Sequence, residues 1–132
     1  MANELAGKTI LLVDDDRDIL EAMKLALEDL GPKILTAANG NDGVKQVEEG
    51  EPDLVVLDQM LPGRSGFLVM EKIRRGRDKN DPPRVIMITA NQGTRHRIYA
   101  ETLGVDMYLN KPFRMEKLLT AVQNVLGVDD EK

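Results

Sequence analysis

The sequence predicts an α/β fold in which helices cover both faces of a doubly wound, five-stranded parallel sheet. Five apolar runs of strand length alternate with segments whose apolar residues recur at helical spacing. Runs such as LVVL at residues 54–57 are apolar on both sides, as in a parallel sheet that is covered on both faces. Because crossover connections are right-handed, few topologies remain, and we expect the strand order 2-1-3-4-5.

Apolar periodicity and turn residues place the elements along the chain. The expected strands are residues 9–13, 33–37, 53–58, 84–89 and 105–110. The expected helices follow them at residues 19–30, 44–49, 67–73, 94–103 and 115–126. The fourth helix has the weakest amphipathic pattern. Gly31 and Pro32 end the first helix, and the segment from Asn39 to Gly43 is predicted to be a turn.

Length and composition indicate one globular domain. The 132 residues are enough for a single core, which we place at residues 8–127, between an N-terminal lead-in at 1–7 and a frayed acidic tail at 128–132. A net charge of −5 argues against a direct nucleic-acid partner. The chain has no cysteine, which excludes thiolate chemistry and cysteine-ligated metals. No run approaches the roughly 18 apolar residues of a membrane span, and the start MANELAGK is not a signal peptide, so we expect a cytoplasmic protein with no membrane partner.

Polar residues gather where the predicted strands end. The strand-end residues are Asp14, Asp15 and Asp16 after the first strand, Asp58 in the third, Thr89 in the fourth, and Asn110 and Lys111 at the fifth. The second strand ends without a reactive group. In the order 2-1-3-4-5 the first, third, fourth and fifth strands are adjacent, so these groups converge on one rim of the sheet.

The convergence of Asp14, Asp15 and Asp58 calls for protonation or for a cation. Two carboxylates about 4 Å apart repel by roughly 4 kcal/mol at an effective dielectric near 20. Oxygen ligands without His or Cys suit a hard ion, and Mg²⁺ fits best. A phosphoryl group arriving there would meet positive charge from the metal and Lys111 and a hydrogen-bond donor in Thr89. A carboxylate can itself be the nucleophile, which gives an aspartyl phosphate.

Four motifs in this order resemble those of response regulator receiver domains of two-component signalling, which are CheY-like. The motifs are ILLVDDD at 10–16, DLVVLDQMLPGRSG at 53–66, IMITA at 86–90 and YLNKPF at 108–113. The resemblance spans roughly residues 8–126 and implies a flavodoxin-like (βα)5 fold.

The resemblance also implies roles for single residues. Asp58 matches the phosphoacceptor. Asp15 matches the acidic residue that binds Mg²⁺ directly, and Asp14 the one that acts through water. Met60 would add its backbone carbonyl to the metal. Thr89 matches the hydroxyl that moves to the phosphoryl group.

Two further residues complete this set. Lys111 matches the lysine that pairs with the phosphoryl group, and the bond from Lys111 to Pro112 would be cis. Tyr108 matches the aromatic residue that turns inward after the threonine moves. Thr89 and Tyr108 would thus form the switch, and the surface of residues 94–103, 105–110 and 115–126 would be the readout.

We therefore expect a signalling phosphoacceptor domain, not an enzyme with a separate substrate. It would catalyse only its own phosphorylation and dephosphorylation, with Mg²⁺ or, alternatively, Mn²⁺. The expected partners are a sensor histidine kinase or histidine phosphotransfer protein, and a downstream protein or fused effector domain. The expected form is a monomer or a weak, phosphorylation-dependent dimer, and the chain is either a stand-alone receiver or one cut from a larger regulator.

Three rival functions are less well supported by the residues. An aspartyl-phosphate phosphatase usually has a second aspartate two residues after the nucleophile, where this chain has Met60. An FMN-binding module needs a phosphate loop, and DDDRD at residues 14–18 would repel phosphate without a metal. A receiver that works without phosphorylation would not need the complete set.

Several residues also have a plain structural interpretation. Asp16 is expected to cap the first helix, and His96 and the run RRGR at 74–77 are expected to be solvated. Ser65 departs from the acidic or amide residue common at its place, and Met60 and Asn91 stand at positions that vary within the family.

Overall fold

The computed structural model describes residues 4–62, 65–75, 77, 81–90 and 94–127, without the side chains of 94–96. These residues form ten elements. The strands are β1 (Thr9–Val13), β2 (Lys33–Ala37), β3 (Leu54–Asp58), β4 (Arg84–Thr89) and β5 (Met107–Asn110). The helices are α1 (Arg17–Glu28), α2 (Gly40–Gly50), α3 (Gly66–Arg74), α4 (Thr94–Thr102) and α5 (Met115–Val125).

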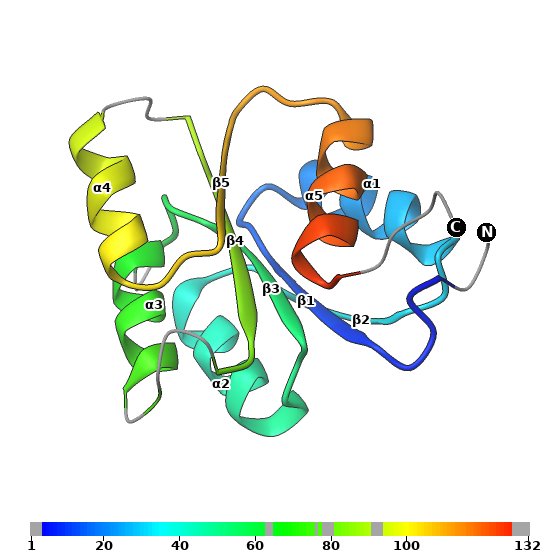
Figure 1. Ribbon diagram of the computed structural model, residues 1–132, viewed down its shortest axis with the longest axis horizontal. Helices are drawn as coiled ribbons and strands as arrows, with labels where there is room; N and C mark the ends of the chain where they lie inside the picture. Colours follow the sequence, from blue (N-terminus) through cyan, green and yellow to red (C-terminus); the bar gives the residue numbers. More distant parts are fainter. Residues whose placement is uncertain (1–3, 63–64, 76, 78–80, 91–93, 128–132) are drawn as a thin grey trace.

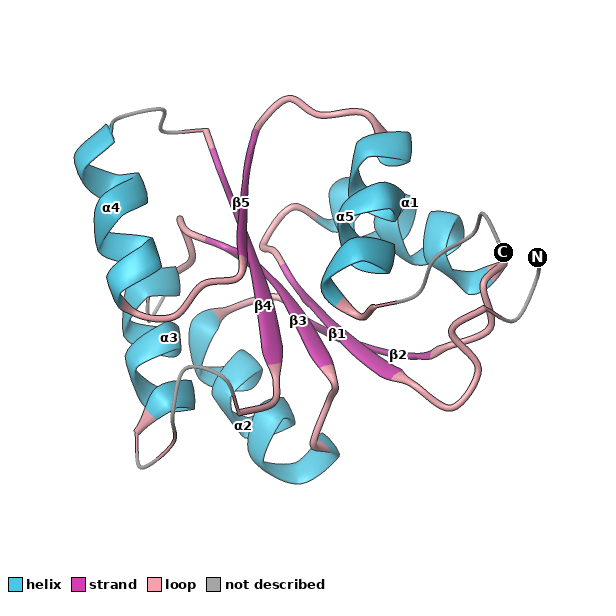
Figure 2. Ribbon diagram, viewed as in Figure 1, coloured by secondary structure: helices cyan, strands magenta, loops and turns pink. Residues whose placement is uncertain are grey.

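The sheet confirms the predicted fold class and strand order. Its order is β2-β1-β3-β4-β5, and every neighbouring pair is parallel. Helices α1 and α5 cover one face, and α2, α3 and α4 cover the other (Figures 1 and 2). All residues of the central strand β3 are buried, which explains its unbroken apolar sequence.

Two apolar layers hold the helices to the sheet. Alternate residues of a strand point to opposite faces, so β1 contributes Leu11 and Val13 to the layer under α2 and α3. It contributes Ile10 and Leu12 to the layer under α1 and α5. The parallel pairing of β1 with β3 and of β3 with β4 sets the carboxyl ends of these strands side by side.

Side-chain caps set two helix starts next to this rim. The prediction for Asp16 is confirmed: its carboxylate accepts hydrogen bonds from the backbone N–H groups of Asp18 and Ile19, and α1 begins at Arg17. The turn predicted after Asn39 is wrong, because α2 begins at Gly40. Asn39 Oδ1 accepts from the N–H of Asp42 at 2.8 Å, so the polar run is the first turn of a capped helix.

The ends of the domain differ in detail from the sequence pattern. Leu5, in the segment expected to be a lead-in, is fully buried in the layer under α1 and α5, and its backbone N–H donates to the carbonyl of Leu30 at 2.8 Å. Strand β5 begins at Met107, two residues later than predicted. The Asp106 carboxylate instead accepts from the Val85 N–H at 2.8 Å. Within the described ranges, no helix has both the length and the apolar character needed to cross a bilayer.

Candidate functional site

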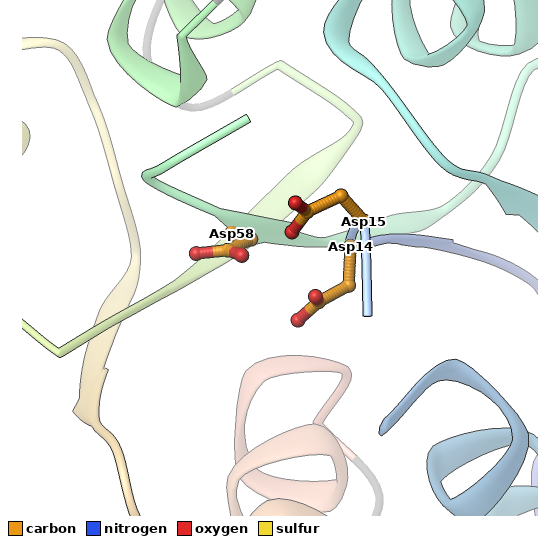
Figure 3. Close-up of side chains that lie close together, drawn as sticks. All are labelled: Asp14, Asp15 and Asp58. Carbon is orange, nitrogen blue, oxygen red and sulfur yellow. The ribbon is translucent and has the colours of Figure 1, made fainter. Parts of the chain in front are cut away.

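The ends of β1 and β3 bring together three carboxylates, Asp14, Asp15 and Asp58, called the acidic cluster below. One oxygen from each lies within 4.8 Å of the others. In Figure 3 the carboxylates of Asp14 and Asp15 extend from the residues after β1 toward the side where Asp58 lies. Asp14 and Asp58 are 1% and 4% exposed, whereas Asp15 is exposed. The predicted convergence of these residues is therefore present in the structure.

Lys111 is the cation at this cluster. Its Nζ lies 3.1 Å from Asp14 Oδ2 and 3.3 Å from Asp58 Oδ2. The other oxygens of the two buried carboxylates accept backbone hydrogen bonds: Asp14 Oδ1 from the Asp16 N–H at 2.9 Å, and Asp58 Oδ1 from the Met60 N–H at 3.1 Å. Both carboxylates are thus held in fixed orientations.

Burial and neighbouring charges shift the pKa values of Asp58 and Lys111. Burial and the nearby charge of Asp14 raise the pKa of Asp58 from 3.8 to about 6, although Met60 and Lys111 act in the opposite direction. Burial alone would lower the pKa of Lys111, but Asp58 and Asp14 outweigh it and leave that pKa above its ordinary value. Asp58 is therefore ionised less readily than an ordinary aspartate, even with Lys111 beside it.

The donor set fits a hard divalent cation. Three carboxylates from two strand ends offer oxygen ligands only, which matches the preference of Mg²⁺ over that of zinc or copper. The peptide after Asp58 lies against its carboxylate through the Met60 N–H. The acidic cluster could hold a metal ion on these grounds.

Thr89 and Lys111 meet at the ends of β4 and β5. Thr89 is fully buried, and its carbonyl accepts from the Lys111 N–H at 2.7 Å. The Lys111–Pro112 peptide bond is cis, as the resemblance implies. The Lys111 side chain reaches both Asp14 and Asp58.

Tyr108 lies on β5 with its ring half-buried and its hydroxyl directed inward. The hydroxyl donates to Gln59 Oε1 at 3.2 Å, and the Arg97 guanidinium carbon lies 5.8 Å from the ring centroid. Burial raises the pKa of Tyr108, while a hydrogen bond with Thr89 and the charge of Arg97 act against that rise.

Gln59 contributes a hydrogen bond to this site that the sequence did not indicate. It is only 4% exposed although it is polar. The available signal was an amide directly after Asp58, at the end of an otherwise apolar run. Asn91 and the side chain of His96 lie outside the described part of the chain.

The region that contains this site matches a known protein family. The family model of the response regulator receiver domain matches residues 10–123. The chain belongs to this family. The receiver domain described here is 37% identical over 122 residues to the phosphate regulon transcriptional regulatory protein PhoB of Pseudomonas aeruginosa. That match covers 92% of this chain and 53% of PhoB, so the chain spans about half the length of this curated relative.

Solved receiver structures have the same fold. A CheY-like receiver domain protein from Methanospirillum hungatei superposes with a TM-score of 0.84 at 30% identity, covering 91% of this chain and 94% of that one. A structure described as the BeF3-activated DrrB receiver domain has a TM-score of 0.80 at 33% identity, covering 91% and 97%. The protein is thus a CheY-like receiver domain of two-component signalling with an acidic pocket at Asp14, Asp15 and Asp58. Receiver domains are phosphoacceptors that interact with histidine kinases and effectors.

Proposed function

We propose that Asp58 accepts a phosphoryl group from the phosphohistidine of a sensor histidine kinase or histidine phosphotransfer protein. The observation that carries this proposal is the position of Asp58, buried within the acidic cluster with one oxygen 3.3 Å from Lys111 Nζ. The other oxygen is held by the Met60 N–H, so the carboxylate is oriented before a donor arrives. We expect the reaction to take place in the cytoplasm.

The proposed step is a phosphoryl transfer to a carboxylate oxygen. An oxygen of Asp58 forms a bond to phosphorus while the bond between phosphorus and the donor nitrogen breaks, and that nitrogen keeps the electron pair. Lys111 would stabilise charge on the transferring group, and the hydroxyl of Thr89 would donate a hydrogen bond to it. Hydrolysis of the acyl phosphate by water would later restore the carboxylate. The domain would supply catalytic groups only for its own phosphorylation and dephosphorylation.

Mg²⁺, or Mn²⁺ in its place, would be held by Asp15, Asp58, Asp14 and the backbone carbonyl of Met60. The metal would supply positive charge that lets a phosphoryl group approach the carboxylates. Exposure of Asp15 supports direct binding by that residue. Asp14, which is buried, would act on the metal through water, as the resemblance implies.

Phosphorylation would act on a pre-existing equilibrium through Thr89 and Tyr108. The two residues lie on neighbouring strands, and Tyr108 also contacts Arg97 of α4. A change at Thr89 would therefore reach the surface of α4, β5 and α5, the proposed readout surface. A downstream protein, a fused effector domain or a second receiver in a weak dimer would bind there.

The test is phosphoryl labelling by a small donor. The wild-type protein is incubated with Mg²⁺ and acetyl phosphate, and its intact mass is measured. We expect one added phosphoryl group, which a metal chelator abolishes. Asp58→Asn should gain none. Asp18→Asn is the matched control, since Asp18 is an exposed aspartate outside the acidic cluster, and it should be labelled like the wild type. Failure of the wild type to be labelled, or equal labelling of Asp58→Asn, would contradict the proposal.

A further inference from the structure

Gln59 has a fixed backbone next to the phosphoacceptor. Its N–H donates to the Ile88 carbonyl at 2.8 Å, and its carbonyl accepts from the Gly66 N–H at 2.8 Å. A Cβ on Gly66 would lie 2.7 Å from Gln59 Cα, so the start of α3 packs directly on this backbone. The side chain of Gln59 therefore leaves from a defined point between β4 and α3.

The buried amide of Gln59 is directed to the hydroxyl of Tyr108. The side chain is 4% exposed, and its Oε1 accepts from the Tyr108 hydroxyl at 3.2 Å. Residues 59 and 108 are far apart in the sequence, so this hydrogen bond links the segment after β3 directly to β5. Without this acceptor, the half-buried hydroxyl of Tyr108 would lack a hydrogen-bond acceptor in the inward position. The free energy of the inward position would then rise, and the outward position of the ring would be favoured.

We propose that Gln59 is a positioning residue that holds Tyr108 inward before any phosphoryl group is present. The Tyr108 hydroxyl then has two inward partners, Thr89 and Gln59. Because Gln59 follows β3 and Thr89 lies on β4, movement of the threonine side chain toward a phosphoryl group leaves the inward ring with an acceptor. The inward position of the Tyr108 ring is therefore populated before phosphorylation. A stronger hydrogen bond to Gln59 gives a larger inward population.

The consequence for signalling rests on the proposed function. If phosphorylation of Asp58 favours the inward ring, then a contact that favours the inward ring must also favour phosphorylation, because the coupling is reciprocal. Gln59 would thereby raise both the basal activity of the readout surface and the extent of labelling. With an apolar residue at position 59, the readout surface would have less basal activity and would depend more strongly on phosphorylation by the donor.

The first experiment observes the ring alone and needs no phosphorylation. The chain has two tyrosines and no tryptophan, so Tyr99→Phe leaves Tyr108 as the only strong emitter. Tyr99 contacts Glu71 and Phe67 on the surface of α3 and is not part of the Gln59 contact. In this background, Gln59→Met keeps the side-chain volume and removes the acceptor.

We expect the ratio of inward to outward ring to fall about fivefold in Gln59→Met, the effect of losing one hydrogen bond. Acrylamide should then quench Tyr108 fluorescence more strongly. Gln123→Met is the matched control, because it makes the same substitution at a hydrogen-bonded glutamine on α5, which donates to Glu4. It should leave the quenching unchanged. Unchanged quenching in a cooperatively unfolding Gln59→Met protein would overturn the proposal.

A second measurement keeps Gln59 in place. Tyr108→Phe removes the donor, and the side-chain amide signal of Gln59 in an ¹⁵N-labelled protein should shift; an unmoved signal would also overturn the proposal. The final extent of labelling by acetyl phosphate should be lower in Gln59→Met than in Gln123→Met, and equal extents would refute the coupling. If the wild type is not labelled at all, the proposed function fails, while the quenching and the amide signal still decide the role of Gln59.

Discussion

Asp58→Asn should stabilise the metal-free protein at neutral pH. The pKa of Asp58 is raised from 3.8 to about 6 by burial and by Asp14, so the folded state favours the protonated carboxyl. The stabilisation from the protonated carboxyl is complete below the ordinary pKa and is lost as the pH rises through about 6. The rise in pKa from 3.8 to about 6 corresponds to a loss of about 3 kcal/mol. An amide in place of the carboxyl does not ionise, and its single oxygen can keep the hydrogen bond from Met60 or the one from Lys111, but not both.

Urea unfolding in EDTA, followed by far-UV circular dichroism, measures this difference. The free energy of unfolding of Asp58→Asn, relative to the wild type, should increase by about 2 kcal/mol between roughly pH 4.5 and 7.5. Saturating Mg²⁺ should reduce the gap at the higher pH, because a ligand of the folded state stabilises the wild type. A gap that is the same at both pH values, or a variant less stable than the wild type at the higher pH, would refute the electrostatic reasoning.

Three further substitutions test other parts of the structure. Lys111→Met removes the cation beside Asp58, so it should raise the pKa of Asp58 further, measured by carboxyl carbon NMR, and slow labelling by acetyl phosphate. Gly66→Ala places a Cβ 2.5 Å from the Asp58 carbonyl oxygen and should cost about 1–3 kcal/mol in urea unfolding. Leu5→Ala, at a fully buried side chain, should cost about 2–5 kcal/mol in the same assay, and a cost near zero would show that the N-terminal segment is not part of the core.

The sheet and the rim at its carboxyl edge were predictable because they depend on patterns that recur along the sequence, namely apolar runs and the polar residues that end them. Strands buried on both faces need unbroken apolar runs, and β3 shows one that ends at Asp58. A parallel sheet places all carboxyl strand ends at one edge, so charges at the ends of β1, β3 and β5 had to meet. The ion pairs of Lys111 with Asp14 and Asp58 follow from that geometry.

The features that were missed depend on side-chain contacts that leave no periodic signal. Asn39 favours a turn and a helix cap equally, and only its hydrogen bond to the Asp42 N–H distinguishes the two. Leu5 is one apolar residue in a polar segment, yet it fills a place in the layer under α1 and α5. Gln59 has a partner on β5 that no local pattern could reveal.

The site of phosphorylation is the most direct test of the central claim. After labelling with Mg²⁺ and acetyl phosphate, borohydride reduces an aspartyl phosphate to homoserine, and peptide mass spectrometry locates the reduced residue. We predict reduction at Asp58 alone, within the peptide that contains the end of β3. Reduction at another acidic residue, or a phosphoryl group retained elsewhere while Asp58 is unmodified, would contradict the assignment of Asp58 as the phosphoacceptor.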